Sequence, residues 1–480
     1  MRCWIALIAM SALWLGGAAA SAQEGPEPRT VEVERALPER FDLRSMDAVT
    51  PVKRQSGGTC WTHGTMSAIE SGLLMSGLWP RMQNNGMPNL AEYHLDWWNG
   101  FNKHENPDVE SREDDETGMT VHRGGDYRVS VAYISRGDGV VYCPEANNHD
   151  RRDAIWYSEA PEKESEEYQR FYVSDVEWFT IGDNLENIET VKRQIMEFGA
   201  LGTCYAAGAG NLENNIHYQP SDSERDPNHS VAIVGWDDTI MDPDNTMPAP
   251  GAWLIKNSWG VGRGDEGYYW ISYYDKFCCR HPEMGAVSFR NIEPLKYDAI
   301  YGHDYHGWRA SMEGVSRAFN VFTATDHHEI QAVSFYASTD DVIYTIKIFG
   351  RFEDGLLLDE LSGKKGFSRF TGFHTVDLDR PVNVETGDEF YVYLEVSHGG
   401  QAIDRTSFIP VLLDDCADCA QDQEEPTGPI VKSAANPGES FYYDGVAWRD
   451  LFEYDFDDPD WGVFDRTANF CIKALGVEAF

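Results

Sequence analysis

Three residues in separate stretches of the sequence could together carry out nucleophilic catalysis. Cys60 lies in QSGGTCWTHG, His229 stands before an apolar run in NHSVAIVGW, and Asn257 follows another apolar run in AWLIKNSW. A thiol is a nucleophile only as a thiolate, and a histidine beside it can take the proton and remain as a charged partner. An asparagine next to that histidine can accept one ring N–H and hold the other nitrogen toward the thiol. We therefore expect these three side chains to share one site.

The residues around Cys60 decide between a nucleophile and a structural thiol. A lone cysteine is most often a buried hydrophobe or half of a disulfide, and the sequence has 9 cysteines. After Cys60, however, Met66, Ile69, Leu73 and Leu74 recur near helical spacing. The thiol would then lie at a helix N-terminus, whose partial positive charge stabilises a thiolate. Catalysis is the preferred interpretation because His229 and Asn257 are also present.

Short elements must position these side chains. Residues 191–198 (VKRQIMEF) are typical of an amphipathic helix that ends at Gly199, and Gly77 is the predicted end of the helix after Cys60. Three apolar runs predict strands at 230–236, 252–259 and 267–273. From about residue 293, short alternating runs separated by turn residues predict an antiparallel β-sandwich.

The motifs GTCW, NHSVAIVGW and KNSWG resemble those of the papain family of cysteine peptidases, in the same order along the chain. The stretch LPERFDLRSMDAVTPVKRQ resembles the start of a mature papain-like domain. The resemblance implies that Cys60 is the nucleophile, His229 the general base and then acid, and Asn257 the residue that orients His229. Trp259 would shield the His229–Asn257 pair from water. No metal and no organic cofactor is implied.

The resemblance also implies how a substrate is held. The side-chain amide of Gln55 would stabilise the oxyanion, together with the backbone N–H of Cys60. Gly124 and Gly125, in HRGGDY, resemble the glycine pair that binds an extended substrate through its backbone.

Some positions depart from the family pattern. Gly57 stands where the family has a cysteine, and His122 stands where the disulfide partner of that cysteine lies, so both halves of one bridge are missing. Gln55 is one residue closer to Cys60 than in the family. We expect His63, three residues after the nucleophile, to be a helix residue that lines the cleft.

The second half resembles the lectin-like β-domain that follows the peptidase domain in some bacterial papain-family proteins, on the stretches KYDAIYGHDYHGW and NPGESFYYDGVAWRDL. Glycan binding there would use exposed aromatics such as Tyr442, Tyr443 or Trp448, but core or turn positions are the favoured interpretation of these residues. The resemblance therefore predicts an α+β protein: a papain-like two-lobed peptidase domain (a helical left lobe and a β-barrel-like right lobe) and an antiparallel β-sandwich domain.

The bulk properties set the remaining limits. A chain of 480 residues with 42% hydrophobic residues predicts a globular protein of two domains. The net charge of −41 argues against nucleic acid and anionic membranes as partners. Cys3–Leu15 with Ala20-Ser21-Ala22 predicts a signal peptide. Its apolar run is shorter than the roughly 20 residues of a membrane-spanning helix, and no later stretch is long and apolar enough to span a bilayer.

We therefore predict a signal peptide at 1–22, a short tether at 23–37, a papain-like domain at 38–290 and a lectin-like β-sandwich domain at 296–477. The tether is too short for an independent inhibitory prodomain. The chain is expected to be secreted, periplasmic or on the cell surface, to hydrolyse polypeptides as an endopeptidase, and to have glycan as a candidate partner of its second domain. Two alternatives remain: a glycan-binding or adhesion protein whose papain-like domain is weak or inactive, and an acyl transferase that forms amide bonds with the same triad.

Overall fold

The computed structural model describes residues 36–82, 86–109, 117–143, 155–208, 215–409, 428–456 and 465–479. The predicted signal peptide and most of the predicted tether lie outside these ranges. Residues 37–480 form one compact unit. No helix in the described ranges is long and apolar enough to cross a membrane.

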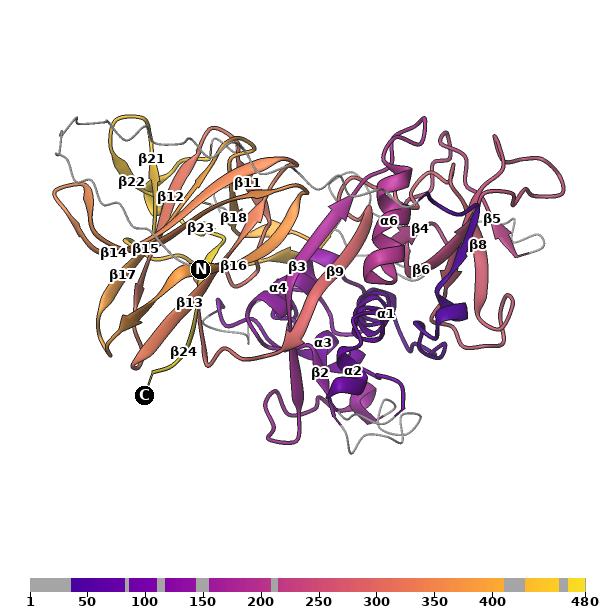
Figure 1. The fold of residues 1–480 in the computed structure, drawn as a ribbon, viewed down its shortest axis with the longest axis horizontal. Coiled ribbons are helices and arrows are strands. Elements are labelled where there is room, and N and C mark those ends of the chain that lie inside the picture. Colours follow the sequence, from indigo (N-terminus) through magenta and orange to yellow (C-terminus); the bar gives the residue numbers. More distant parts are fainter. Residues whose placement is uncertain are drawn as a thin grey trace, which may run out of the picture. The chain divides into compact units, whose positions relative to one another are not determined.

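The first half of the chain contains the helices and the strands that surround them (Figure 1). The helices are α1 (Cys60–Met75), α2 (Leu78–Arg81), α3 (Glu92–Trp98), α4 (Tyr127–Ser135) and α6 (Ile188–Phe198). The strands are β1 (Arg40–Asp42), β2 (Val141–Tyr142), β3 (Gln169–Phe179), β4 (Leu201–Tyr205), β5 (Ile216–His217), β6 (His229–Asp237), β7 (Ala252–Lys256), β8 (Tyr268–Ser272) and β9 (Ala286–Pro294).

The two predicted helices end where glycines allow the chain to turn. Gly77 follows α1 with φ +64°, and Gly199 caps α6 with φ +104°. These are backbone conformations that glycine adopts without steric cost. The apolar face of α6 packs with strands β6, β7 and β8 in one hydrophobic core, to which Val191, Ile233 and Trp253 belong. The predicted helices and the three predicted strands are confirmed in type, but the strand predicted at 252–259 ends at Lys256, just before Asn257.

The second half of the chain consists of strands and short turns. They are β10 (Ala299–Tyr301), β11 (Ala310–Met312), β12 (Arg317–Thr323), β13 (His328–Ala337), β14 (Val342–Glu353), β15 (Leu356–Ser368), β16 (Gly372–Val384), β17 (Glu389–Val396), β18 (Gln401–Asp404), β19 (Ser407–Phe408), β20 (Ile430–Val431), β21 (Ser440–Tyr443), β22 (Trp448–Asp450), β23 (Asn469–Phe470) and β24 (Ile472–Glu478).

Two sheets of this second half enclose a core of their own. One is six-stranded, in the order β15-β14-β17-β12-β21-β22, and the other contains β10-β24-β13-β16. Ile346 and Val392 from the first sheet share a buried cluster with Val333 and Ile472 from the second. This is the predicted β-sandwich, and the predicted α+β class is confirmed.

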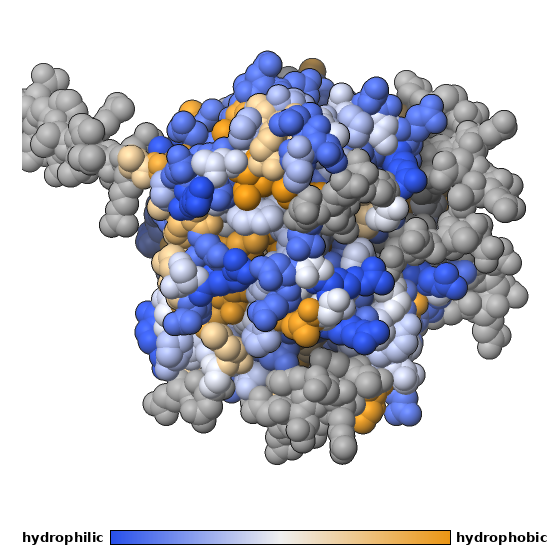
Figure 2. Space-filling view, turned by 90° about the vertical axis from the view of Figure 1, so that its right-hand side faces the viewer, coloured by the Kyte–Doolittle hydropathy of each residue, from blue (hydrophilic) through white to orange (hydrophobic). Residues whose placement is uncertain are grey.

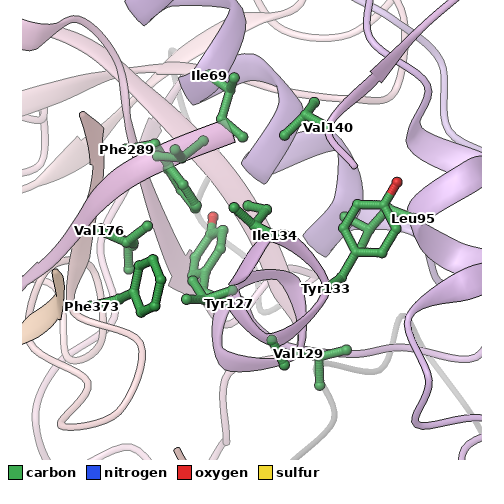
Figure 3. Packing of buried hydrophobic residues seen from close by; sticks show 14 of the residues in the cluster. Ile69, Leu95, Tyr127, Val129, Tyr133, Ile134, Val140, Val176, Phe289 and Phe373 are labelled. Atoms are coloured by element: carbon green, nitrogen blue, oxygen red, sulfur yellow. The ribbon is translucent and has the colours of Figure 1, made fainter. Parts of the chain in front are cut away.

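The second sheet does not end within the sandwich. Strand β16 pairs with β3 of the first half, with Phe373 opposite Val176, so one sheet runs through both halves of the chain. Beneath it, one hydrophobic core combines Ile69 of α1, Tyr127 of α4 and Phe289 of β9 with Phe373 of β16 (Figure 3). The segment expected to be a separate domain thus shares a sheet and a core with the segment before it.

One face of the molecule can be compared with the polar composition of the sequence. In the view of Figure 2 it consists mostly of hydrophilic residues, interrupted by hydrophobic patches.

Candidate active site

Cys60 is the first residue of α1 and is fully buried. No acidic residue lies in the first turn of this helix, so no carboxylate there offsets its partial positive charge. Thr59 precedes it and donates its hydroxyl to the carbonyl of Ser56 at 3.0 Å. The thiol therefore lies at the position where a helix N-terminus favours the thiolate.

His229 is the first residue of β6, and its neighbour Asn228 ties this strand to the end of β4. The Asn228 side chain exchanges hydrogen bonds with the backbone of Ala207, accepting from its N–H at 2.7 Å and donating to its carbonyl at 3.2 Å. The His229 ring is buried, and its Nε2–H donates to Asn257 Oδ1 at 2.9 Å. Asn257 Oδ1 also accepts the backbone N–H of Ser258 at 2.8 Å, which fixes the orientation of the amide.

The other ring nitrogen, Nδ1, is buried and has no hydrogen-bond partner among the described residues. The pKa of His229 is lowered to about 4, chiefly by burial and also by the charge of His63, while the hydrogen bond to Asn257 opposes this shift. The neutral ring therefore carries its proton on Nε2 and leaves Nδ1 as an acceptor. A charged imidazolium in this position would need a neighbouring thiolate to stabilise it.

Trp259 covers the histidine. Its ring stacks on that of His229, with centroids 4.4 Å apart and planes 24° apart. The guanidinium of Arg263 lies over the same indole, 5.4 Å from its centroid. The stack limits access of water to the hydrogen bond between His229 and Asn257.

Close packing brings the first turns of α1 against the start of β6. A Cβ added to Gly64 would stand 2.6 Å from Ser230 Oγ, so only a glycine permits this approach. Tyr205, on β4, packs edge-on against the His229 ring at 5.7 Å between centroids. Burial raises the pKa of Tyr205. Tyr205 thus lies against His229, and α1, which begins at Cys60, packs against β6, whose first residue, His229, hydrogen-bonds Asn257.

Gln55 lies beside this group, and Ser258 orients it. Ser258 Oγ donates to Gln55 Oε1 at 2.6 Å, and the backbone N–H of Gln55 donates to the carbonyl of Ser258 at 2.7 Å. One N–H of the Gln55 amide donates to the carbonyl of Gly57 at 2.9 Å. An amide nitrogen has two N–H donors, so the predicted oxyanion role depends on the second.

The predicted substrate-binding glycines lie against the loop that precedes Cys60. Gly124 donates its N–H to the carbonyl of Gly58 at 2.9 Å. A Cβ on Gly125 would stand 2.5 Å from the indole of Trp61, so the chain can pass over this ring only at a glycine. The Gly124 N–H is thus already used within the protein.

The positions of the missing disulfide are adjacent. A Cβ added to Gly57 would lie 3.2 Å from the Cβ of His122 and 2.9 Å from Tyr157 Oη. The ring of Tyr157 stacks on His122 with centroids 4.1 Å apart, and His122 Nδ1 pairs with Asp96. The segment around Tyr157 therefore packs against the loop before Cys60.

Three features of the site were not found from the sequence. Ser258 contacts both Gln55 and Asn257, but a serine between two motif residues gives no signal of its own. A buried ion-pair cluster joins Lys53 Nζ to Glu70 of α1 at 2.7 Å and to Glu92 of α3. These residues are distant in sequence, so local patterns do not reveal the cluster. The third feature is the stack of Tyr157 on His122.

His63, expected to line the cleft, is buried, and its Nδ1–H donates to the carbonyl of Thr59 at 2.8 Å.

One group in the described part of the chain has the composition of a metal site: Asp108, His306 and Asp404. Its members bond to the protein itself. His306 Nε2–H donates to the carbonyl of Gly100 at 3.0 Å, and Ser433 Oγ donates to Asp404 Oδ1 at 2.7 Å. Burial and then the charge of Asp108 raise the pKa of Asp404 to about 8, so a neutral Asp404 accounts for the group without an ion. None of these residues belongs to the site around Cys60.

Comparison with known proteins gives two family matches. Residues 122–287 match the papain family cysteine protease profile, and residues 300–476 match that of the lectin like domain. The resemblance to the papain family is therefore confirmed, together with the order of the two domains.

Individual relatives agree with these matches. Procathepsin L of Felis catus is 25% identical over 239 residues, which are 48% of this chain and 60% of that protein. Cathepsin K of Gallus gallus is 23% identical over 263 residues, 50% of this chain and 61% of that protein. The chain thus spans about 60% of the length of the curated relatives it matches.

Two solved structures match nearly the whole chain. The clostridial cysteine protease Cwp84 after propeptide cleavage has a TM-score of 0.67, with 92% of this chain and 99% of that chain covered. The cysteine protease and lectin-like domains of Cwp84, a surface layer associated protein of Clostridium difficile, have a TM-score of 0.66, with 93% and 90% covered. Both are 21% identical to this chain, which shows a common fold.

Proposed function

Because a papain-family domain is followed by a lectin-like domain, we propose that this chain is an exported cysteine endopeptidase. The observation that supports this most directly is the buried hydrogen bond of 2.9 Å between His229 Nε2 and Asn257 Oδ1, which leaves Nδ1 as an acceptor. The substrate is a polypeptide, and no cofactor takes part in the reaction.

The mechanism is acyl transfer through a thioester. The Cys60 thiol gives its proton to His229 Nδ1, and the thiolate attacks the carbonyl carbon of the peptide bond. The α1 N-terminus and the second N–H of Gln55 stabilise the negative charge that develops on the carbonyl oxygen. His229 then protonates the leaving amine, and a water molecule, deprotonated by His229, releases the acyl group from Cys60.

Asn257 and Trp259 act through the histidine. Asn257 holds the imidazole in the tautomer with its proton on Nε2, and Trp259 keeps water from this hydrogen bond. Both effects leave Nδ1 free to take a proton and to give it back during the cycle. Gly124 and Gly125 lie beside the loop that carries Cys60, where an extended substrate would lie.

Cleavage of an unfolded protein tests the reaction. The full chain should cut casein at internal positions and should cut peptides whose two ends are blocked. Cys60→Ala should abolish both activities. Cleavage restricted to free ends would contradict an endopeptidase, and cleavage by the Cys60→Ala variant would contradict the whole mechanism.

The location and the second partner are further parts of this proposal. The net charge of −41 suits a protein that stays in solution outside the cell, and Cwp84, which shares the fold, is a surface layer associated protein. The match to the lectin like domain over residues 300–476 supports glycan as the ligand of the second half. Fractionation of cells that express the full chain, with cytoplasmic and surface markers, tests the location.

A further inference from the structure

The six-stranded sheet of the second half has two faces of different character. Along β17, Phe390, Val392 and Leu394 point into the sandwich core. Tyr391 and Tyr393, between them in sequence, belong to a second hydrophobic cluster on the opposite face of the sheet. The outer face of this sheet therefore carries aromatic side chains where a solvated face would carry polar ones.

The aromatic residues of the outer face contact one another across four strands. Phe319 on β12 stacks on Phe441 of β21, with centroids 4.8 Å apart and planes 12° apart. Phe352, near the end of β14, packs against Phe319 at 5.0 Å and against Tyr391 at 6.2 Å. Together these rings form one continuous aromatic layer that ends at Phe352 and Tyr391.

A cavity of about 720 Å³ lies at this end of the aromatic layer. The segment Gly350–Glu353 lines it on one side, and Asn383 and the segment Gly387–Tyr391 line it on the other. The hairpin of β14 and β15 shifts its register between Ile348 and Phe349, just before the segment that lines the cavity. The volume falls within the range of small-ligand sites, about 300–1,000 Å³.

The polar groups of the cavity form hydrogen bonds with one another and with neighbouring groups. Arg351 Nε donates to Asp359 at 2.6 Å, and its Nη1 donates to Glu353 at 3.0 Å. Tyr391 Oη donates to Glu389 at 3.2 Å. Asp388 accepts the backbone N–H of Glu385 at 3.0 Å. Each of these groups keeps further donor or acceptor capacity, because carboxylates and guanidinium groups form several hydrogen bonds.

The composition of the lining restricts the ligand. Carboxylates at Glu353, Asp388 and Glu389 outnumber the one cation, Arg351, so an anionic ligand is disfavoured. Aromatic rings beside planar polar groups suit a molecule with flat apolar faces and many hydroxyls at its edge. We propose that this cavity binds a neutral saccharide, with Phe352 and Tyr391 as its apolar wall and Glu353, Asn383 and Asp388 as its hydroxyl-binding groups.

This inference rests on the proposal that the second half binds glycan, and it names the surface and the class of sugar. The test uses the full chain with Cys60→Ala, so that self-cleavage does not interfere. The migration of the protein is measured in native gels that contain one soluble neutral polysaccharide: yeast mannan, laminarin, galactomannan or glycogen. A gel that contains alginate serves as the anionic probe. At least one neutral polysaccharide should retard the protein, and alginate should not.

The variants locate the site. Phe352→Ala and Asn383→Ala should each weaken the retardation. The dissociation constant obtained from it should rise by about tenfold or more, as expected for the loss of one good contact. Asn383 is exposed, so its replacement leaves the sandwich core intact. Phe367→Ala is the matched control, because Phe367 is 57% exposed on β15 and does not line the cavity.

Retardation that is equal in the wild-type chain, Phe352→Ala and Asn383→Ala would overturn this cavity as the site but keep glycan binding. Retardation by alginate alone would overturn the argument from charge. If neither a neutral polysaccharide nor alginate retards the wild-type chain, both this inference and the proposed glycan binding fail. Cleavage of casein is a separate readout, and its outcome is independent of these results.

Discussion

A Cβ on Gly57 would stand 3.2 Å from the Cβ of His122, at the two positions where the papain family has a disulfide. In this chain backbone hydrogen bonds and an aromatic stack hold the same two segments together. The N–H of Gly58 donates to the carbonyl of His122 at 2.8 Å, and Tyr157 stacks on the His122 ring. Noncovalent contacts thus connect the loop before Cys60 to the segment that continues into Gly124.

Tyr157→Ala tests this connection. The variant loses the stack on His122 and the edge contact with Tyr93. We expect a loss of about 1–3 kcal/mol in the free energy of unfolding and a higher KM, because the segment at Gly124 is less well held. Tyr157→Phe keeps both ring contacts and is the control. Equal stability and KM for the two variants would show that the stack contributes nothing.

Gly125→Ala tests the close approach to Trp61. The added methyl group would stand 2.5 Å from the indole, so the segment or the ring must move. Overpacking of this kind costs about 1–3 kcal/mol, and kcat/KM should fall as well. Gly262→Ala is matched to it, because a Cβ there meets no atom within 4 Å. Thermal unfolding and peptide cleavage measure both effects, and a normal Gly125→Ala variant would contradict the packing described.

Ser258→Ala tests whether this hydroxyl positions Gln55. Loss of the hydrogen bond of 2.6 Å frees the Gln55 amide to rotate. We expect Gln55→Ala to lower kcat by about 10²-fold and Ser258→Ala to lower it less, both with little change in KM. In the double variant the two effects should not add, because Ser258 acts through Gln55. Additive effects would show that Ser258 acts by another route.

Protonation of the buried His94 ring should lower the free energy of unfolding in acid. Burial lowers its pKa to about 4, while the unfolded chain binds this proton at about pH 6.5. The stability that the neutral ring contributes is therefore complete above about pH 6.5 and is lost as the pH falls toward 4, by about 3 kcal/mol in total. His94→Gln removes this titration, so its stability should fall less between pH 7 and pH 4 in denaturant unfolding. Parallel curves for the variant and the wild-type chain would contradict this.

Local patterns in the sequence predicted the elements of the site. Apolar residues after Cys60 at helical spacing and Gly77 at its end defined α1, and the apolar runs next to His229 and Asn257 defined β6 and β7. The order of these motifs resembles that of the papain family, and residues 122–287, which include His229 and Asn257, match the profile of that family. Each of these signals lies within about ten residues of the position it concerns.

Contacts between distant segments were not predictable in the same way. The pairing of β16 with β3 joins residues about 200 positions apart, and nothing local specifies which strands pair. Core or turn positions were the favoured interpretation of the aromatics at 442, 443 and 448; Tyr442 packs against the sandwich core, whereas Trp448 lies with the outer cluster. The face of the sheet on which a strand residue lies depends on the pairing register of its strand. The residues next to it in the sequence do not determine that register.

Covalent labelling tests most directly whether Cys60 is a nucleophile activated by His229. The full chain is treated with an epoxide inhibitor of papain-like peptidases, and the modified residue is identified by peptide mass spectrometry. We expect one adduct per chain, on Cys60, and labelling that slows by about 10²-fold or more in His229→Ala. His327→Ala, at a partly exposed histidine of the second half, should label at the wild-type rate. No adduct, an adduct on another cysteine such as Cys204, or undiminished labelling in His229→Ala would contradict the proposed site.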